Sequence, residues 1–126
     1  MGSIDGVNFI QVNLHRSKAA TLLFSNNFGK YAIGFVQEPY TVKGEISGIK
    51  RGLYTVLHRP DKNEFPRAGL ILNKDLVHLP LTQFISRDLV AALADFEMNG
   101  VSHKVVWLHL IIMRTLIQFP MILKNS

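Results

Sequence analysis

Glu38 is the residue whose type and position most suggest chemistry. It follows the short apolar run of residues 31–36, within the sequence Gln37-Glu38-Pro39. An apolar run of this length is typical of a strand buried on both faces, and Pro39 ends it. The carboxylate is therefore expected at the C-terminal end of a buried strand, the edge at which open α/β sheets bind ligands and metals. The alternative is that Glu38 is simply the first solvated residue after a core strand.

Asn13 is the second candidate, because it ends an earlier strand. Residues 7–13 alternate apolar and polar side chains, and the segment Ser17–Phe28 then spaces its apolar residues like one face of a helix. Strand, helix and strand with short joints form a βαβ unit with a right-handed crossover. Because its parallel strands end side by side, Asn13 and Glu38 could together hold a hard cation and a phosphate oxygen. The alternative is that Asn13 only caps the following helix.

The elements around this unit are predicted from turn residues and apolar runs. Gly29 is expected to cap the helix in a left-handed conformation. Residues 41–50 alternate glycines with charges and predict an exposed loop, whereas residues 52–57 and 67–72 predict the two strands of a hairpin. Basic side chains in this region could face phosphates or form an ordinary solvated surface. They are Lys50, Arg51, Arg59, Lys62 and Arg67.

The second half of the chain is predicted to be rich in strands. Residues 82–94 form the next expected strand. Arg87 and Asp88 within it should each form a structural ion pair or hold a neighbouring loop, because buried charges need partners. Asn99-Gly100 predicts a hairpin turn before a returning strand that begins at His103. The five histidines lack the spacing of zinc ligands.

Composition limits the class of protein. The 126 residues are 48% hydrophobic and 18% charged, enough apolar side chains for one folded domain. The absence of cysteine excludes disulfides, zinc–thiolate sites and a thiol nucleophile. A net charge of +5 and a pI near 9.8 favour a polyanionic partner such as nucleic acid, although excess lysine also keeps many proteins soluble. We expect no signal peptide and an intracellular setting, since no basic stretch precedes an apolar core near residue 1.

Four segments that occur in order resemble one known domain when taken together. They are IQVNLHRSKAAT (Ile10–Thr21), FVQEPY (Phe35–Tyr40), PRAGLI (Pro66–Ile71) and FISRDLV (Phe84–Val90). This set resembles the N-terminal half of the endonuclease domain of jockey-like non-LTR retrotransposons, a member of the endonuclease/exonuclease/phosphatase family. The resemblance covers residues 7–106. It implies a partial α/β sandwich of that type, with a mixed sheet and a helix packed on it.

The resemblance also implies roles for individual residues. Glu38, in Gln-Glu-Pro, matches the carboxylate that binds the catalytic Mg²⁺, and Asn13, in Gln-Val-Asn-Leu, matches the active-site asparagine near the scissile phosphate. Both are thus implied to be catalytic and to hold the metal. Arg16, Lys18 and Tyr40 flank them and are candidates for contacting DNA, with a surface or packing role as the alternative. The implied reaction cuts one DNA strand in the nucleus and leaves a 3′-hydroxyl that primes reverse transcription.

The sequence departs from the family in its later motifs. The complete domain continues to an active-site tyrosine, a Gly-Asp-x-Asn motif and a terminal Ser-Asp-His, none of which occurs here. We therefore expect one sheet to be largely complete, the other to lack most of its strands, and the chain to be inactive by itself. The alternatives are a non-catalytic DNA-binding fragment and a fragment that needs a partner to fold.

The two ends of the chain fall outside the resemblance. Residues 1–6 are expected to form a flexible leader. Residues 107–126 form an apolar tail that does not continue the family pattern. Codons in a shifted frame from Trp107 permit Ala-Ser-Phe-Tyr, which matches the family's next strand, so a frameshift after Val106 is one hypothesis. Polar and charged side chains in the tail argue against a membrane segment and favour an amphipathic or core helix that ends near Pro120.

Overall fold

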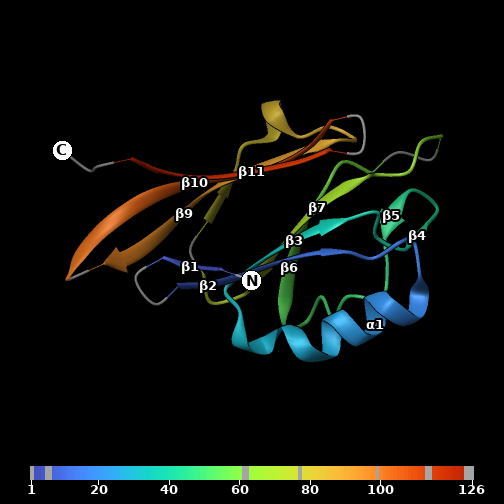
Figure 1. The fold of residues 1–126 in the computed structure, drawn as a ribbon, viewed down its shortest axis with the longest axis horizontal. Helices are drawn as coiled ribbons and strands as arrows, with labels where there is room; N and C mark the ends of the chain where they lie inside the picture. The colour runs from blue at the N-terminus through green and yellow to red at the C-terminus, as the bar shows by residue number, and fades with distance from the viewer. Residues whose placement is uncertain are drawn as a thin grey trace.

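The computed structural model describes residues 2–4, 7–60, 63–76, 78–98, 100–112 and 115–123. Figure 1 shows three layers, which are a four-stranded sheet, a five-stranded sheet and the helix α1. The five-stranded sheet has the order β1 (Gly2–Ile4), β2 (Val7–Asn13), β3 (Ile33–Gln37), β7 (Ala68–Asn73) and β6 (Tyr54–Leu57). The four-stranded sheet has the order β11 (Thr115–Leu123), β10 (Val101–Ile112), β9 (Leu89–Met98) and β8 (His78–Pro80). The remaining elements are α1 (Lys18–Asn27), the 3₁₀ helices η1 (Phe28–Lys30) and η2 (Thr82–Phe84), and the short strands β4 (Thr41–Val42) and β5 (Glu45–Ile46).

The predicted βαβ unit is present as β2, α1 and β3. Strands β2 and β3 are parallel neighbours, with Asn13 opposite Gln37. Ser17 caps the helix, because its Oγ accepts a 3.1 Å hydrogen bond from the Ala20 backbone N–H. The alternative in which Asn13 caps the helix is therefore wrong. The expected left-handed cap at Gly29 is also wrong, since the chain tightens there into the 3₁₀ helix η1.

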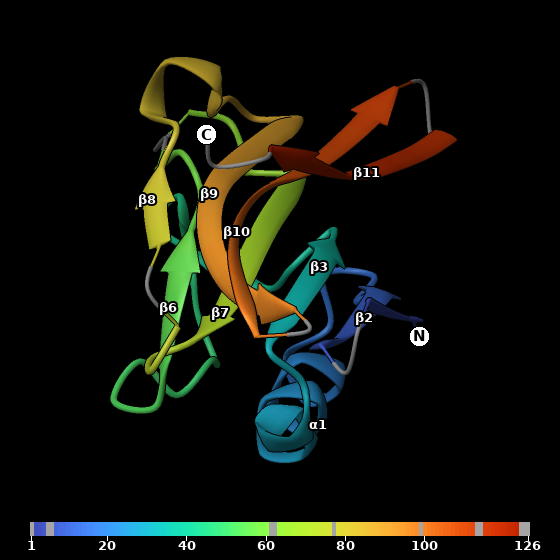
Figure 2. The same ribbon diagram turned by 90° about the vertical axis from the view of Figure 1, so that its left-hand side faces the viewer.

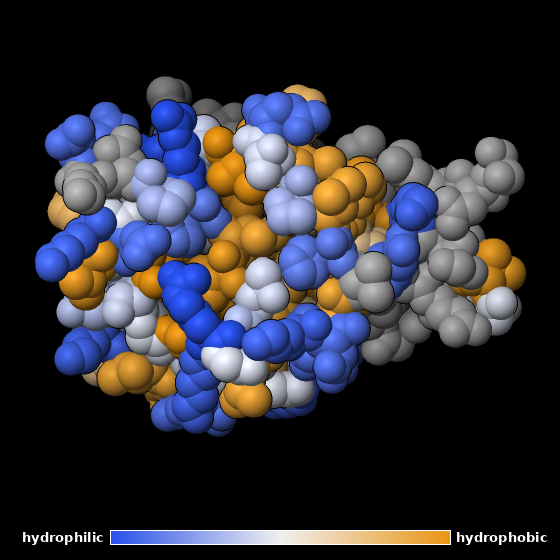
Figure 3. All heavy atoms as spheres, turned by 180° about the vertical axis from the view of Figure 1, so that it is seen from behind, coloured by the Kyte–Doolittle hydropathy of each residue, from blue (hydrophilic) through white to orange (hydrophobic). Residues whose placement is uncertain are grey.

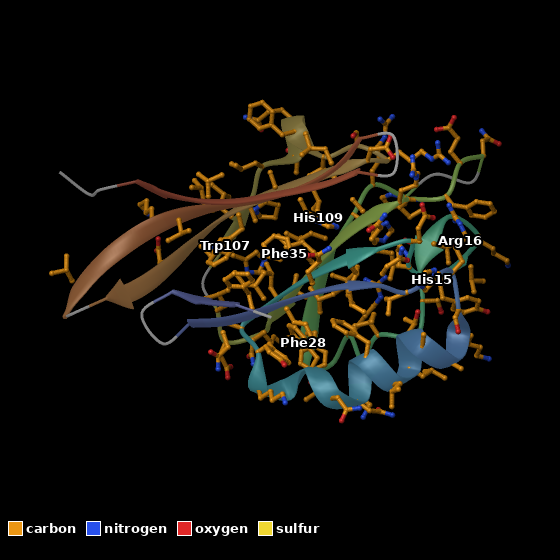
Figure 4. The ribbon with its side chains drawn as sticks, viewed as in Figure 1. His15, Arg16, Phe28, Phe35, Trp107 and His109 are labelled. Carbon is orange, nitrogen blue, oxygen red and sulfur yellow. The ribbon has the colours of Figure 1, made fainter. Side chains whose placement is uncertain are left out.

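Strand β3 is buried on both faces, as its continuous apolar run predicts. Ile33 and Phe35 pack into a core between the two sheets, whereas Val36 packs into a second core on the side of α1. Figures 1 and 2 place α1 against the face of the five-stranded sheet that points away from β9 and β10. In Figure 4, Phe35 lies between the sheets and Phe28 lies on the helix side. The strand that carries Glu38 at its end is thus fixed from both sides.

Gly34 allows aromatic side chains of the helix layer to pack closely on β3. A Cβ atom at this position would lie 2.8 Å from Phe28 Cε1 and 2.9 Å from Phe24 Cζ, closer than side chains allow. We expect Gly34→Ala to lower the free energy of unfolding by about 1–3 kcal/mol, because two buried rings must move. Urea denaturation measures this change. Gly52→Ala is the matched control, since a Cβ there meets nothing within 4 Å. Equal losses in the two variants would contradict this packing.

The segment 41–50 is not the exposed loop that its glycines predict. Strands β4 and β5 pair across a turn at Lys43 and Gly44, both with positive φ. Ile46 and Ile49 are buried in the core on the helix side. Burial of the two isoleucines therefore holds this segment against the domain, although the residues around them are polar. The hairpin of β6 and β7 pairs antiparallel as predicted.

The strand expected over residues 82–94 begins later, at Leu89. Its first part instead forms η2 and a loop that carries Arg87 and Asp88. Both charged side chains remain partly exposed because the chain has not yet entered the sheet. Strands β9 and β10 then form the predicted hairpin, in which Gly100 has a φ of 76°.

The apolar tail continues the sheet and does not form the expected helix. Strand β10 runs through Val106 to Ile112 and pairs with β9 on one side and β11 on the other. Val105, Trp107 and His109 are buried at every second position, a period that favours a strand over a helix. Figure 4 shows the latter two residues between the sheets. Within the described residues, no helix has the length and apolar content needed to cross a membrane.

Two further expectations about completeness are wrong. The second sheet, which was expected to lack most of its strands, has four of them and covers the first sheet. Part of the expected leader, Gly2–Ile4, forms β1 and pairs antiparallel with β2. In both cases strand pairing satisfies backbone groups that the sequence pattern alone leaves unassigned.

Candidate active site

The C-terminal ends of β2 and β3 place Asn13 and Glu38 at the same edge of the sheet. Two backbone hydrogen bonds join the segments that leave these strands. The Leu14 N–H donates to the Gln37 carbonyl at 2.8 Å, and the Arg16 N–H donates to the Glu38 carbonyl at 2.7 Å. The parallel pairing thus brings the two residues to neighbouring strand ends, as the βαβ pattern predicts.

Glu38 lies between two guanidinium groups. Its Oε2 is 2.7 Å from Arg16 Nη2, and its Oε1 accepts a 2.9 Å hydrogen bond from Arg67 Nε. Arg67 also lies 3.4 Å from Asp88 Oδ1. We call these four side chains the Glu38 cluster. The exposed fraction is 37% for the Arg16 side chain but 21% for that of Arg67. Arg67 also pairs with two carboxylates and Arg16 with one, so Arg16 is the member more easily displaced.

The backbone at this edge adopts conformations that are unusual for residues with side chains. His15 and Arg16 have φ values of 51° and 57° and form the centre of a turn, closed by a 2.9 Å hydrogen bond from Ser17 N–H to the Leu14 carbonyl. Glu38 has a φ of 51°. The left-handed conformation costs such residues about 1–2 kcal/mol each. Strained backbone concentrates at functional sites, so its occurrence here supports the choice of this edge.

The Asn13 side chain stabilises the turn that follows β2. Its Oδ1 accepts a 2.9 Å hydrogen bond from the His15 backbone N–H, and the residue is exposed. An amide oxygen has two lone pairs, so one acceptor position remains. Asn13 can therefore hold the turn and still offer an oxygen to a cation.

The three candidates for DNA contact lie differently with respect to Glu38. Arg16 belongs to the Glu38 cluster, and its guanidinium carbon lies 4.8 Å from the centre of the Phe65 ring. Lys18 is the exposed first residue of α1. Tyr40 is half-buried, two residues beyond Glu38. Of these three, the structure pairs Arg16 with Glu38.

Arg87 and Asp88 have separate partners, and the partner of Asp88 is Arg67, which the sequence indicates only as one of several basic side chains that could face phosphates. Asp88 pairs with Arg67, whereas Arg87 Nε donates a 3.0 Å hydrogen bond to the Phe65 carbonyl. Arg67 directly precedes β7, the antiparallel neighbour of β3. That position is the signal that could have identified it as a neighbour of Glu38.

The donor atoms at this edge suit a hard divalent cation. Mg²⁺ in proteins is commonly held by one or two carboxylates, with waters and substrate phosphates completing its shell. Glu38 offers a carboxylate and Asn13 an amide oxygen. Among the described residues, no group of three His, Cys, Asp or Glu side chains is arranged to hold a metal ion. For such a cation to bind here, water or phosphate would have to supply the other ligands, and Glu38 would have to give up part of its pairing with arginine.

Comparisons with known proteins bear on the fold. The sequence matches no family model and no curated protein. Among solved structures, the endonuclease domain of TRAS1, a telomere-specific non-LTR retrotransposon, matches with a TM-score of 0.51 and 20% sequence identity. The match covers 77% of this chain and 42% of that one, so the chain spans less than half of the solved structure. Over the shared portion, the chain has the mixed α/β fold of that endonuclease domain.

Proposed function

We propose that the chain is a portion of a Mg²⁺-dependent DNA endonuclease of the endonuclease/exonuclease/phosphatase family, encoded by a jockey-like non-LTR retrotransposon. The observation that carries the proposal is the placement of Glu38 and Asn13 at adjacent strand ends. The likeness in fold to the TRAS1 endonuclease domain supports it. The proposed substrate is nuclear DNA, in which one phosphodiester is hydrolysed and the resulting 3′-hydroxyl primes reverse transcription.

Each member of the site has a distinct role in this proposal. Glu38 and Asn13 would hold Mg²⁺, and the bound cation would stabilise negative charge on the phosphate and the leaving oxygen. Arg67, paired with Asp88, keeps the Glu38 carboxylate oriented toward the edge. Arg16 would give up Oε2 in favour of the cation, and its guanidinium would then be available to a phosphate oxygen.

Removal of the Arg16 charge should favour cation binding. We expect Arg16→Gln to tighten the affinity for Mg²⁺ by up to about fivefold, because an ion pair this exposed contributes about 0.2–1 kcal/mol. Isothermal titration calorimetry measures the affinity. Arg51→Gln is the matched control, since that guanidinium contacts the Ile46 carbonyl instead of Glu38. Weaker or unchanged binding in Arg16→Gln would contradict the displacement of Arg16.

The chain alone is expected to bind DNA without nicking it efficiently. It lacks the later family motifs, and a missing general base alone lowers a rate by about 10²–10⁴-fold. Fluorescence anisotropy should show affinity that falls with salt, and a supercoiled plasmid with Mg²⁺ should stay intact. Mg²⁺-dependent nicking that Glu38→Ala abolishes would support the chemistry and overturn the expected inactivity. A chain that binds no DNA would contradict the proposed function.

A fragment that requires a partner is the second candidate, and an apolar cavity of about 370 Å³ between β2 and α1 favours it. Leu23 on its rim is 66% exposed, which is costly for a leucine in water. A partner that covers this cavity would remove Leu23 and the apolar lining from water. Unfolding in urea that lacks a cooperative transition would favour this candidate. The apolar side chains that line the cavity include Ile10, Val12, Ala20 and Phe24.

A further inference from the structure

The described end of the loop before β7, residues 63–67, lies next to the edge that carries Glu38, whose N–H donates a 2.9 Å hydrogen bond to the Arg67 carbonyl. It returns to the sheet at Ala68, which pairs with Gln37, the residue before Glu38. From the turn that follows β2, the Arg16 guanidinium lies over the Phe65 ring of this loop, with its carbon 4.8 Å from the ring centre. The view from behind in Figure 3 shows mostly hydrophilic side chains at this end of the molecule, with apolar ones among them. The loop is therefore positioned to touch whatever approaches Glu38.

Phe65 is an aromatic side chain held in place at the surface. Its exposed fraction is 54%, and it belongs to neither hydrophobic core. Arg16 contacts its ring, and Arg87 Nε donates a 3.0 Å hydrogen bond to its carbonyl. Packing in the core does not account for this position. A fixed, exposed ring is instead suited to stack on a planar ligand.

Two further arginines line a cavity next to the segment that carries Phe65. A polar cavity of about 360 Å³ is lined by both Arg59 and Arg87, together with Pro66, the residue that follows the phenylalanine. Guanidinium groups bind phosphate oxygens through paired N–H donors. Glu64 also lines this cavity and offsets part of its positive charge. The cavity thus offers phosphate donors, and the residues on both sides of Phe65 line it.

We propose that Phe65, Arg59 and Arg87 form a subsite for one unpaired nucleotide of the DNA strand, next to the phosphodiester that meets Glu38. The base stacks on the Phe65 ring, and its phosphate is held by the two guanidinium groups. This subsite rests on the proposed function, because it presumes a DNA strand at Glu38. It adds a preference for a locally unpaired base, which the Glu38 cluster alone does not supply.

The test is the binding of a fluorescent thymine oligonucleotide to the whole chain without metal, measured by anisotropy. We expect Phe65→Ala to weaken binding by about 5- to 150-fold, since stacking of one base contributes about 1–3 kcal/mol. Phe65→Trp should retain the affinity. Phe84→Ala, at a phenylalanine that is 52% exposed in η2, should leave it unchanged. Arg59→Gln should flatten the slope of log affinity against log salt by about 0.7.

An abasic oligonucleotide of the same length separates stacking from a structural effect. We expect Phe65→Ala and the wild-type chain to bind it equally, because it has no base to stack. A Phe65→Ala variant that binds the thymine probe as tightly as Phe84→Ala does would overturn the subsite and leave the proposed function standing. A wild-type chain that binds neither probe nor duplex DNA would overturn both.

Discussion

Replacement of Trp107 by alanine should lower the free energy of unfolding by about 3–5 kcal/mol, as removal of a buried aromatic side chain usually does. Only 1% of the Trp107 surface is exposed. The ring lies between the two sheets, with its centre 5.7 Å from that of Phe9 and 6.0 Å from that of Phe35. The loss would therefore open a cavity where the sheets meet. Urea denaturation followed by circular dichroism measures it.

Val101→Ala provides the control on the same strand. Val101 begins β10 and is 56% exposed, so its truncation should change the free energy of unfolding by less than about 0.5 kcal/mol. Trp107→Phe should lose much less stability than Trp107→Ala, because the phenyl ring fills part of the space that the indole ring occupied. Equal effects of Trp107→Ala and Val101→Ala would mean that the second sheet does not pack as described.

The same result bears on the proposed frameshift after Val106. A large loss would show that residue 107 stabilises the fold in the frame as written, whatever the origin of the tail. Sequencing of the genomic and transcribed nucleic acid beyond the Val106 codon tests the frameshift itself. A one-base shift that restores Ala-Ser-x-Tyr, and later Gly-Asp-x-Asn and Ser-Asp-His, would support it. An unbroken frame with a real stop would overturn it.

Acidification should destabilise the protein through His109, a fully buried histidine on β10. Burial lowers the pKa of His109 to about 4, only partly offset by its 3.0 Å hydrogen bond from Nε2 to the Val36 carbonyl. The ordinary pKa is 6.5, so the unfolded chain takes up a proton before the folded one does. The share of the free energy of unfolding that depends on a neutral His109 is complete above pH 6.5. It is lost as the pH falls to about 4, in total about 3 kcal/mol.

His109→Gln isolates this effect from other titrating groups. The pKa of His58 is also lowered, by burial and by the charge of Arg51, and it contributes in the same direction. We therefore compare the free energies of unfolding of the wild-type chain and of His109→Gln from neutral pH to about 4. The advantage of the wild type should shrink by about 3 kcal/mol over this range. A constant difference would contradict a buried neutral histidine.

The part of the fold that the sequence predicts is the part fixed by local patterns. The alternation in residues 7–13, the helical spacing after Ser17 and the apolar run before Glu38 each specify one element. Because the loops between these elements are short, the elements can assemble in one way, as a parallel βαβ unit. This unit places Asn13 beside the end of β3. Local patterns are thus sufficient to bring the two candidate residues together.

The remainder depends on contacts between distant segments. Trp107 and His109 lie in an apolar run that is compatible with a helix, and pairing with β9 and β11 makes it a strand. Ile46 is buried because β6 and β7 provide a surface for it, which no pattern in residues 41–50 reveals. The pairing of Arg67 with Glu38 joins residues 29 positions apart. Contacts of this kind form only when distant strands have assembled into sheets, so local sequence patterns do not predict them.

Binding of a divalent cation to Glu38 tests the central claim most directly. Mn²⁺, which stands in for Mg²⁺ and has an electron paramagnetic resonance signal, is titrated into the wild-type chain, Glu38→Gln and Glu45→Gln. Glu45 is an exposed glutamate on β5 and serves as the matched control. We expect the wild-type chain and Glu45→Gln to bind one ion with the same affinity, and Glu38→Gln to lose that binding. Equal binding by Glu38→Gln and the wild-type chain would contradict the assignment of this edge as the metal site of a nuclease.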